Sequence, residues 1–140
     1  MKRPQQIGAC ALLFNNNGWV LLGKRKNGYK EGYYGLPGGR VEVNEPVVTT
    51  VQREVEEETG LKLDNFEYLG VVRENQGDYD FIHFVYAAKN ISKQPMLREP
   101  EKCEGWIWTD INNINEDVLP GHQAAIEMYL TKKQLIDQTS

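Results

Sequence analysis

Near its amino end the chain has two apolar runs with a polar turn between them. Residues 7–14 form a continuous apolar run, and Asn15-Asn16-Asn17-Gly18 follows as strong turn chemistry. Residues 19–22 are apolar again and lead into the basic trio Lys24-Arg25-Lys26. This pattern predicts a buried strand and the returning strand of a hairpin. Residues 27–39 are rich in glycine and are expected to be mostly loop.

Helical spacing is clearest over residues 45–59. Asn44 is a suitable cap, Pro46 suits the first turn, and Gly60 suits the end of the helix. The stripe that we expect to face the core consists of Val47, Val48, Val51 and Val55.

The remainder of the chain mixes predicted strands with one more predicted helix. Residues 66–73 and 81–88 are expected to be strands joined by a turn at Gly77-Asp78, and residues 106–108 a short strand. Residues 91–104 are a polar connection, and residues 123–136 are expected to form the second helix. The connections are too short for regular βαβ crossovers, so the fold class is α+β or mixed α/β. No linker or repeat divides residues 1–140, which we expect to form a single domain.

Composition and charge exclude several classes of protein. The 140 residues are 40% hydrophobic and 26% charged, with a net charge of −4, which is ordinary for a globular domain. An acidic surface argues against a nucleic-acid polymer as partner, and no run reaches the ~20 apolar residues that cross a membrane. Cys10 and Cys103 lack metal-ligand spacing, and no cleavage site follows the first apolar run. We therefore expect reduced thiols and a cytoplasmic protein.

Acidic side chains crowd the end of the first predicted helix. Residues 53–58 read Arg-Glu-Val-Glu-Glu-Glu, and helical spacing places Glu54, Glu57 and Glu58 on one side. Each like-charge pair costs roughly 0.2–0.5 kcal/mol in an isolated helix. A solvated acidic face is one interpretation. The other is a site for a hard cation such as Mg²⁺, which binds carboxylates together with substrate phosphates.

The residues around this cluster decide between the two interpretations. The stretch from 39 to 61 reads Gly39-x5-Glu45-x7-Arg53-Glu54-Val55-x-Glu57-Glu58-x-Gly60-Leu61. It resembles the Nudix box of the Nudix hydrolases at every specified position, and Leu36-Pro37-Gly38-Gly39 resembles its lead-in. The resemblance implies an αβα sandwich around a central mixed sheet and the hydrolysis of nucleoside diphosphates linked to another group. It also implies Mg²⁺ or Mn²⁺ as the cofactor.

The same resemblance assigns roles to individual residues. Glu54, Glu57 and Glu58 match the metal-binding and base positions, and the Gly38 carbonyl matches a backbone ligand. Arg53 is expected to act with these catalytic glutamates by bracing them. The structural positions of the box are Glu45, which pairs with Arg53, and Gly39 and Gly60, which form its turns. A downstream acid often completes the metal site, and Glu101 is our choice over Glu99 and Glu104.

Likeness to the MutT-like branch implies cleavage of a nucleoside triphosphate, including oxidised ones such as 8-oxo-dGTP, to a monophosphate and pyrophosphate. Glu54 is expected to help deprotonate the attacking water. Arg25 is a candidate phosphate contact and Leu36 a candidate base contact, although a solvated cation and a core leucine are ordinary alternatives. Gly38 and Gly39 complete the expected substrate contacts together with His83, where the related branch tends to have threonine.

Other substrates and one non-catalytic role stay open on the sequence. A dinucleoside polyphosphate, a nucleotide sugar or a pterin triphosphate would suit the same box. A nucleotide-binding sensor without turnover is disfavoured because Glu54, Glu57 and Glu58 are all present. In each case the expected partner is a small nucleotide, with no nucleic-acid polymer and no membrane. The resemblance also leaves a homodimer open.

Overall fold

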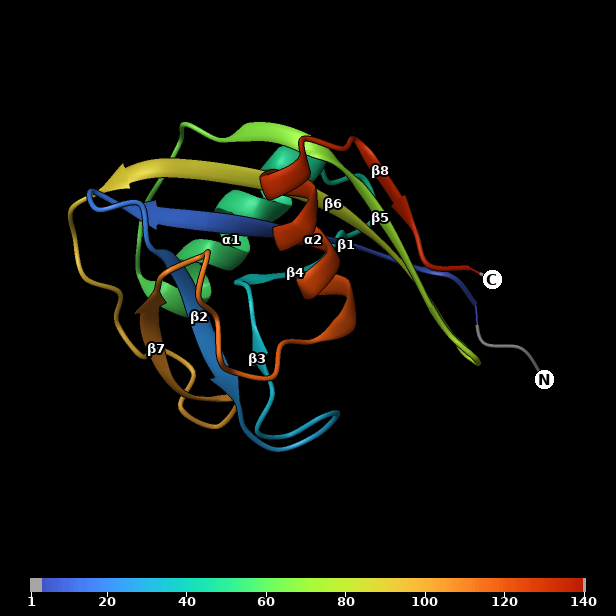
Figure 1. The fold of residues 1–140 in the computed structure, drawn as a ribbon, viewed down its shortest axis with the longest axis horizontal. Coiled ribbons are helices and arrows are strands. Elements are labelled where there is room, and N and C mark those ends of the chain that lie inside the picture. The colour runs from blue at the N-terminus through green and yellow to red at the C-terminus, as the bar shows by residue number, and fades with distance from the viewer. Residues whose placement is uncertain (1–3, 140) are drawn as a thin grey trace.

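The computed structural model describes residues 4–139. Ten elements follow one another, and the described part of the chain has eight strands and two helices (Figure 1). In chain order they are β1 (Gln6–Asn15), β2 (Val20–Arg25), β3 (Tyr34–Gly35), β4 (Gly38–Arg40), α1 (Val47–Thr59), β5 (Glu67–Gln76), β6 (Tyr79–Ile91), β7 (Cys103–Thr109), α2 (Pro120–Thr131) and β8 (Leu135–Asp137).

The strands form one mixed sheet with a central parallel pair. Strand order along the main path is β3-β2-β1-β6-β5-β8, with β4 added to β1 and β7 added to β2. β1 and β6 run parallel over most of their length, whereas β1–β4, β5–β6 and β2–β7 are antiparallel. The predicted hairpin at residues 15–18 is confirmed, but β1 and β2 pair only through Phe14 and Val20. β2 then diverges to pair with β3 and β7.

Each face of this sheet is covered by one helix (Figure 1). Along β1 the side chains alternate, as a strand requires. Cys10, Leu12 and Phe14 pack in the cluster that contains α2, whereas Ala9, Ala11 and Leu13 pack in the cluster that contains α1. The continuous apolar run of the sequence therefore reflects a strand buried on both faces. The result is the expected αβα arrangement around a mixed sheet.

The first helix begins two residues later than predicted. Its N-cap is Pro46, without a side-chain cap, and Asn44 lies outside the helix with φ 65°. Gly60 ends it in the left-handed conformation with φ 75°, as predicted. The valine stripe is narrower than expected, because Val51 and Val55 are buried while Val48 is exposed.

The second helix was predicted too long. It ends at Thr131, where Lys132 adopts φ 59°, and residues 135–137 form β8 instead. β8 pairs in parallel with β5 at the open edge of the sheet. That pairing depends on a strand more than 60 residues earlier in the chain, so local periodicity could not reveal it. Neither helix of the described residues is long and apolar enough to cross a membrane.

Candidate active site

A Gly-rich turn, residues 35–39, connects the elements that build the site. Three successive residues are each held by a different element. The Leu36 amide donates to His122 Nδ1 in α2 (2.9 Å), and the Pro37 carbonyl accepts from the Ala11 amide in β1 (3.0 Å). The Gly38 amide donates to Glu58 Oε1 in α1 (3.0 Å).

The turn lies directly against the acidic helix. A Cβ on Gly39 would lie 2.6 Å from both carboxylate oxygens of Glu54, so only glycine lets this carboxylate take its place. A Cβ on Gly38 would likewise lie 2.7 Å from the Cys10 Cα in β1. Close approach of backbone to carboxylate is therefore the physical reason for glycine here.

Burial leaves two of the glutamates poorly compensated. It raises the pKa of Glu58 well above its usual range, and the neighbouring Glu54 and Glu99 raise it further. It also raises the pKa of Glu54, although Arg53 acts in the opposite direction. The Gly38 amide is the hydrogen-bond donor that the structure shows for the Glu58 carboxylate. Carboxylates in this condition gain from a bound cation.

Arg53 holds the helix and its preceding loop together. Its Nε and Nη2 donate to the two oxygens of Glu45 at 2.8 and 3.0 Å, and Nη1 donates to Glu54 Oε1 at 2.7 Å. The hydrogen bonds from Arg53 lower the pKa of Glu45 to about 2. The bracing pair expected from the resemblance is thus present in the structure.

The other acidic residues of the expected site differ in their exposure and in whether they line a cavity. Glu57 is half-exposed and its Oε2 lies 3.4 Å from Arg53, on the solvent side of the helix. Glu99 lines the cavity beside Glu58. Glu101, our expected downstream acid, is exposed and does not line the cavity; its backbone carbonyl accepts from Asn27 instead. On geometry, Glu99 is the better placed of the two.

A cavity of about 250 Å³ opens beside these carboxylates. Glu58, Gly38, Gly39 and Glu99 line one part of it, and the expected substrate contacts Arg25, Leu36 and His83 line it as well. The Arg25 Nε donates to the Tyr29 carbonyl at 2.9 Å, which orients its guanidinium. Leu36 both packs in the hydrophobic core and lines the cavity.

Aromatic rings form a ladder along the wall of this cavity. Tyr29, Tyr79 and Phe81 stack in series with centroid distances of 5.6 Å, and Phe81 stacks on His83 at 4.4 Å. The ladder joins the loop after β2 to alternate positions of β6. Flat rings beside a polar end suit a ligand that has a planar base and a phosphate chain.

Two further polar residues at the cavity were not predicted. Glu74 is 3% exposed, and its Oε1 lies 2.9 Å from His83 Nε2. His122 lies beside them, its ring centroid 5.5 Å from that of His83. The chain has two histidines, and both line this cavity. Nothing local in the sequence connects them, because they come from β6 and α2.

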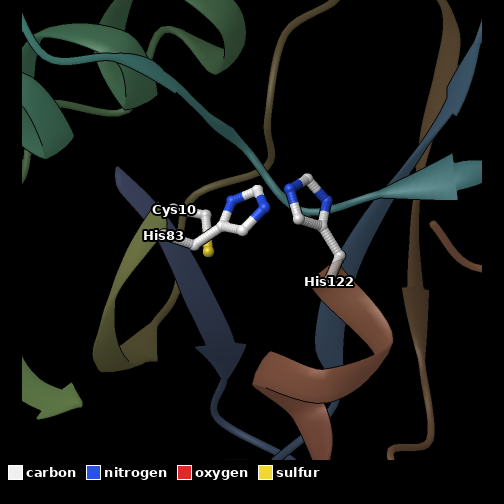
Figure 2. Close-up of side chains that lie close together, drawn as sticks. All are labelled: Cys10, His83 and His122. Atoms are coloured by element: carbon white, nitrogen blue, oxygen red, sulfur yellow. The ribbon is translucent and has the colours of Figure 1, made fainter. Parts of the chain in front are cut away.

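Figure 2 shows Cys10, His83 and His122 gathered from three elements. Among the described residues, this is the one group of three or more potential ligand atoms within 4.8 Å of one another. Its hydrogen bonds do not suit a metal. His122 Nδ1 accepts from Leu36, so the neutral ring carries its proton on Nε2 and offers no lone pair there. Burial also raises the pKa of the Cys10 thiol to about 12.

The carboxylates of α1 suit a metal better. Oxygen donors are the ligands of Mg²⁺ and Mn²⁺, and Glu54 and Glu58 are buried without full compensation. Glu54, Glu57 and Glu58 do not form a group of three whose oxygens all lie within 4.8 Å of one another. Their oxygen donors nevertheless fit the cofactor that the box implies.

Comparison with known proteins finds one family that matches most of the chain. The model of the NUDIX domain matches residues 4–130. The oxidized purine nucleoside triphosphate hydrolase of Danio rerio is 29% identical over 99 residues, covering 69% of this chain and 62% of that protein. The methanol dehydrogenase activator of Bacillus methanolicus is 29% identical over 94 residues, covering 67% of this chain and 50% of that protein. The chain thus spans about half to three-fifths of the length of these relatives.

Solved structures match over more of the chain. A MutT NUDIX hydrolase from Burkholderia pseudomallei is 31% identical with a TM-score of 0.82, covering 89% of this chain and 98% of that one. The MutT protein of Methanosarcina mazei Go1 has a TM-score of 0.83 at 24% identity, covering 94% and 97% of the two chains. At that lower identity the likeness concerns the fold.

Proposed function

The chain belongs to the Nudix family, and from that premise we propose that it is a Mg²⁺- or Mn²⁺-dependent hydrolase of nucleoside triphosphates. The reaction is cleavage of a phosphoanhydride bond to a nucleoside monophosphate and pyrophosphate. The observation that carries this proposal is the arrangement of Glu58 and Gly38 at one part of a cavity whose wall is a ladder of aromatic rings.

Each part of the site has a role in this reaction. The carboxylates of Glu54, Glu57 and Glu58 and the Gly38 carbonyl would hold the ion, with Glu99 in place of Glu101 as the additional acid. The bound ion neutralises phosphate charge and acidifies water. Arg25 binds the phosphate chain of the substrate, and the nucleobase lies between Leu36 and the aromatic wall.

Glu54 is suited to take the proton of the attacking water. Its Oε1 accepts from Arg53, which fixes the carboxylate and leaves Oε2 for the proton. Burial raises its pKa, and a base is most effective when its pKa lies closer to the working pH. The water oxygen bonds to one of the two phosphorus atoms that flank the bridging oxygen between the α- and β-phosphates. The bond from that phosphorus to the bridging oxygen breaks, and the other fragment leaves with the bonding electrons, so that the products are a nucleoside monophosphate and pyrophosphate.

The test is hydrolysis of a nucleotide panel with and without Mg²⁺. The panel contains the canonical and oxidised deoxynucleoside triphosphates, ADP-ribose, a nucleotide sugar and a dinucleoside polyphosphate. Glu57→Gln should lower kcat by about 10²-fold or more and keep the fold, because it removes a half-exposed ligand. Glu56→Gln, its neighbour on the same helix, is the matched control. No Mg²⁺-dependent turnover of any member would favour a nucleotide sensor, and preference for ADP-ribose would change the substrate.

A further inference from the structure

The residue that accepts a hydrogen bond from the Leu36 amide of the Gly-rich turn lies outside the Nudix box. His122 comes from the start of α2, and its Nδ1 accepts the Leu36 amide at 2.9 Å. Leu36 is 6% exposed, so its amide has little access to water as an alternative partner. A buried amide that loses its acceptor costs about 1–3 kcal/mol.

The surroundings are shaped to bring this ring to the turn. Gly35 lies beside it, and a Cβ there would come within 2.9 Å of His122 Nδ1. Gly121 lets the first turn of α2 pack against the His83–Glu74 pair, since a Cβ on Gly121 would lie 2.5 Å from His83 Nε2. Two glycines on different elements therefore permit one contact between α2 and the turn.

The protonation state of His122 suits an acceptor. Burial and the nearby His83 and Arg25 lower its pKa to about 3, so the ring is neutral at physiological pH. A neutral imidazole that accepts at Nδ1 donates at Nε2, and its orientation is set by the Leu36 amide. Figure 2 shows the ring at the start of α2, turned toward His83.

A short stretch of backbone connects this contact to the carboxylates expected to bind the metal. Leu36 is two residues before Gly38, whose amide binds Glu58, and three before Gly39, which lies against Glu54. The Pro37 carbonyl is already held by β1. Without His122, the turn would keep its bonds to β1 and α1, and Tyr34 would keep its bonds to the segment before α2, but the Leu36 amide would lose the acceptor that the structure shows for it.

We propose that His122 is a positioning residue for hydrolysis: by accepting a hydrogen bond from the Leu36 amide, it clamps the Gly-rich turn to α2 and thereby positions Gly38 and Gly39, and through them the carboxylates of Glu58 and Glu54. It acts through the backbone of residues 36–39 and needs no contact with substrate. This role rests on the proposed function only for its effect on activity, because the clamp itself is a property of the protein alone.

Three substitutions of His122 distinguish the effect of losing the hydrogen-bond acceptor at Nδ1 from the effect of losing the imidazole ring. His122→Asn places an amide oxygen close to the position of Nδ1 and keeps the acceptor. His122→Gln extends its amide toward the position of Nε2 and leaves nothing at Nδ1. His122→Phe keeps the ring volume without any acceptor, and Gln123→Ala, an exposed neighbour in α2, is the matched control.

Hydrogen exchange of the Leu36 amide in the metal-free protein tests the clamp directly. Exchange should be about tenfold or more faster in His122→Phe and His122→Gln than in the wild type, and close to wild type in His122→Asn. Unchanged exchange in both acceptor-free variants would overturn the proposal, whether or not the protein hydrolyses any nucleotide. If His122→Phe fails to fold, the comparison of Asn with Gln decides.

Kinetics then test the effect on the carboxylates, using a nucleotide that the wild type hydrolyses. The acceptor-free variants should lower kcat about tenfold or more and raise the Mg²⁺ concentration for half-maximal rate, with rescue by His122→Asn. A merely structural residue would lower the melting temperature without moving the Mg²⁺ dependence. Equal kcat and Mg²⁺ dependence in all variants, with exchange altered, would overturn the positioning role.

Discussion

The Glu54 carboxylate lies against Gly39 and occupies the space that a side chain at position 39 would need. A Cβ on Gly39 would lie 2.6 Å from both oxygens of the Glu54 carboxylate. The position of the proposed base is therefore set by the absence of a side chain 15 residues earlier in the chain. Arg53 fixes the same carboxylate from its other side through Oε1.

Gly39→Ala should abolish most of the activity while the protein still folds. The new methyl group displaces the Glu54 carboxylate, and displacement of about 1 Å can cost 10²-fold in rate. Gly105→Ala is the matched control, because its Cβ would meet nothing within 4 Å. The measurements are kcat and melting temperature; a Gly39→Ala protein with the wild-type rate would exclude a role for this contact.

Arg53→Lys should lower both stability and activity. A lysine cannot donate to both oxygens of Glu45 and to Glu54 at once. Loss of these charged hydrogen bonds should lower the free energy of unfolding. Arg73→Lys changes a comparable bidentate pair, with Asp80, outside the site and should retain hydrolysis. If both variants kept the wild-type rate, the bracing role of Arg53 would be wrong.

Mg²⁺ affinity should rise with pH. The pKa of Glu58 is raised well above 4.5, so a fraction of the folded protein holds a proton that the ion must displace. Without metal and above pH 4.5, Glu58 holds more of its proton in the native state than in the unfolded chain. Its contribution to stability therefore decreases as pH rises through the raised pKa. Calorimetric titration in buffers of different ionisation enthalpy should show proton release on Mg²⁺ binding.

Glu58→Gln should weaken Mg²⁺ binding and reduce that proton release, whereas Glu56→Gln should leave both unchanged. Binding that is equally tight at every pH in the wild type would contradict the protonated state inferred for Glu58. Added Mg²⁺ should also raise the melting temperature of the wild type, since a ligand of the native state stabilises it by mass action.

His83→Phe should destabilise the fold, because it leaves the buried Glu74 carboxylate without its partner. The pair is 2.9 Å apart and both residues are buried, so the expected loss is about 1.5–3 kcal/mol in urea unfolding. A double variant, His83→Phe with Glu74→Leu, should recover part of that loss, because no polar group is then left unpaired. A single variant as stable as the wild type would show that water or another group satisfies Glu74.

Much of this protein was accessible from its sequence alone. The buried β1, the turn before β2, the helix end at Gly60 and the β5–β6 pair depend on local pattern and turn chemistry, and they were predicted close to their bounds. The resemblance to the Nudix box likewise implied that Arg53 and Glu45 brace the box, and the pair forms because one helix and its preceding loop place residues eight positions apart.

Tertiary structure decided what depends on distant parts of the chain. β8 formed where a helix was expected because the edge of β5 offers hydrogen bonds that no local window contains. Glu99 rather than Glu101 lines the cavity. The sequence could not show this, because the connection after β6 is irregular and has no periodic pattern. His122 meets Leu36 only because α2 packs on the face of the sheet formed by β1 and β6. Glu74 meets His83 because β5 pairs with β6 in a register that places Val72 opposite His83. Residue identity determines which chemistry is available, but packing between elements determines which groups meet.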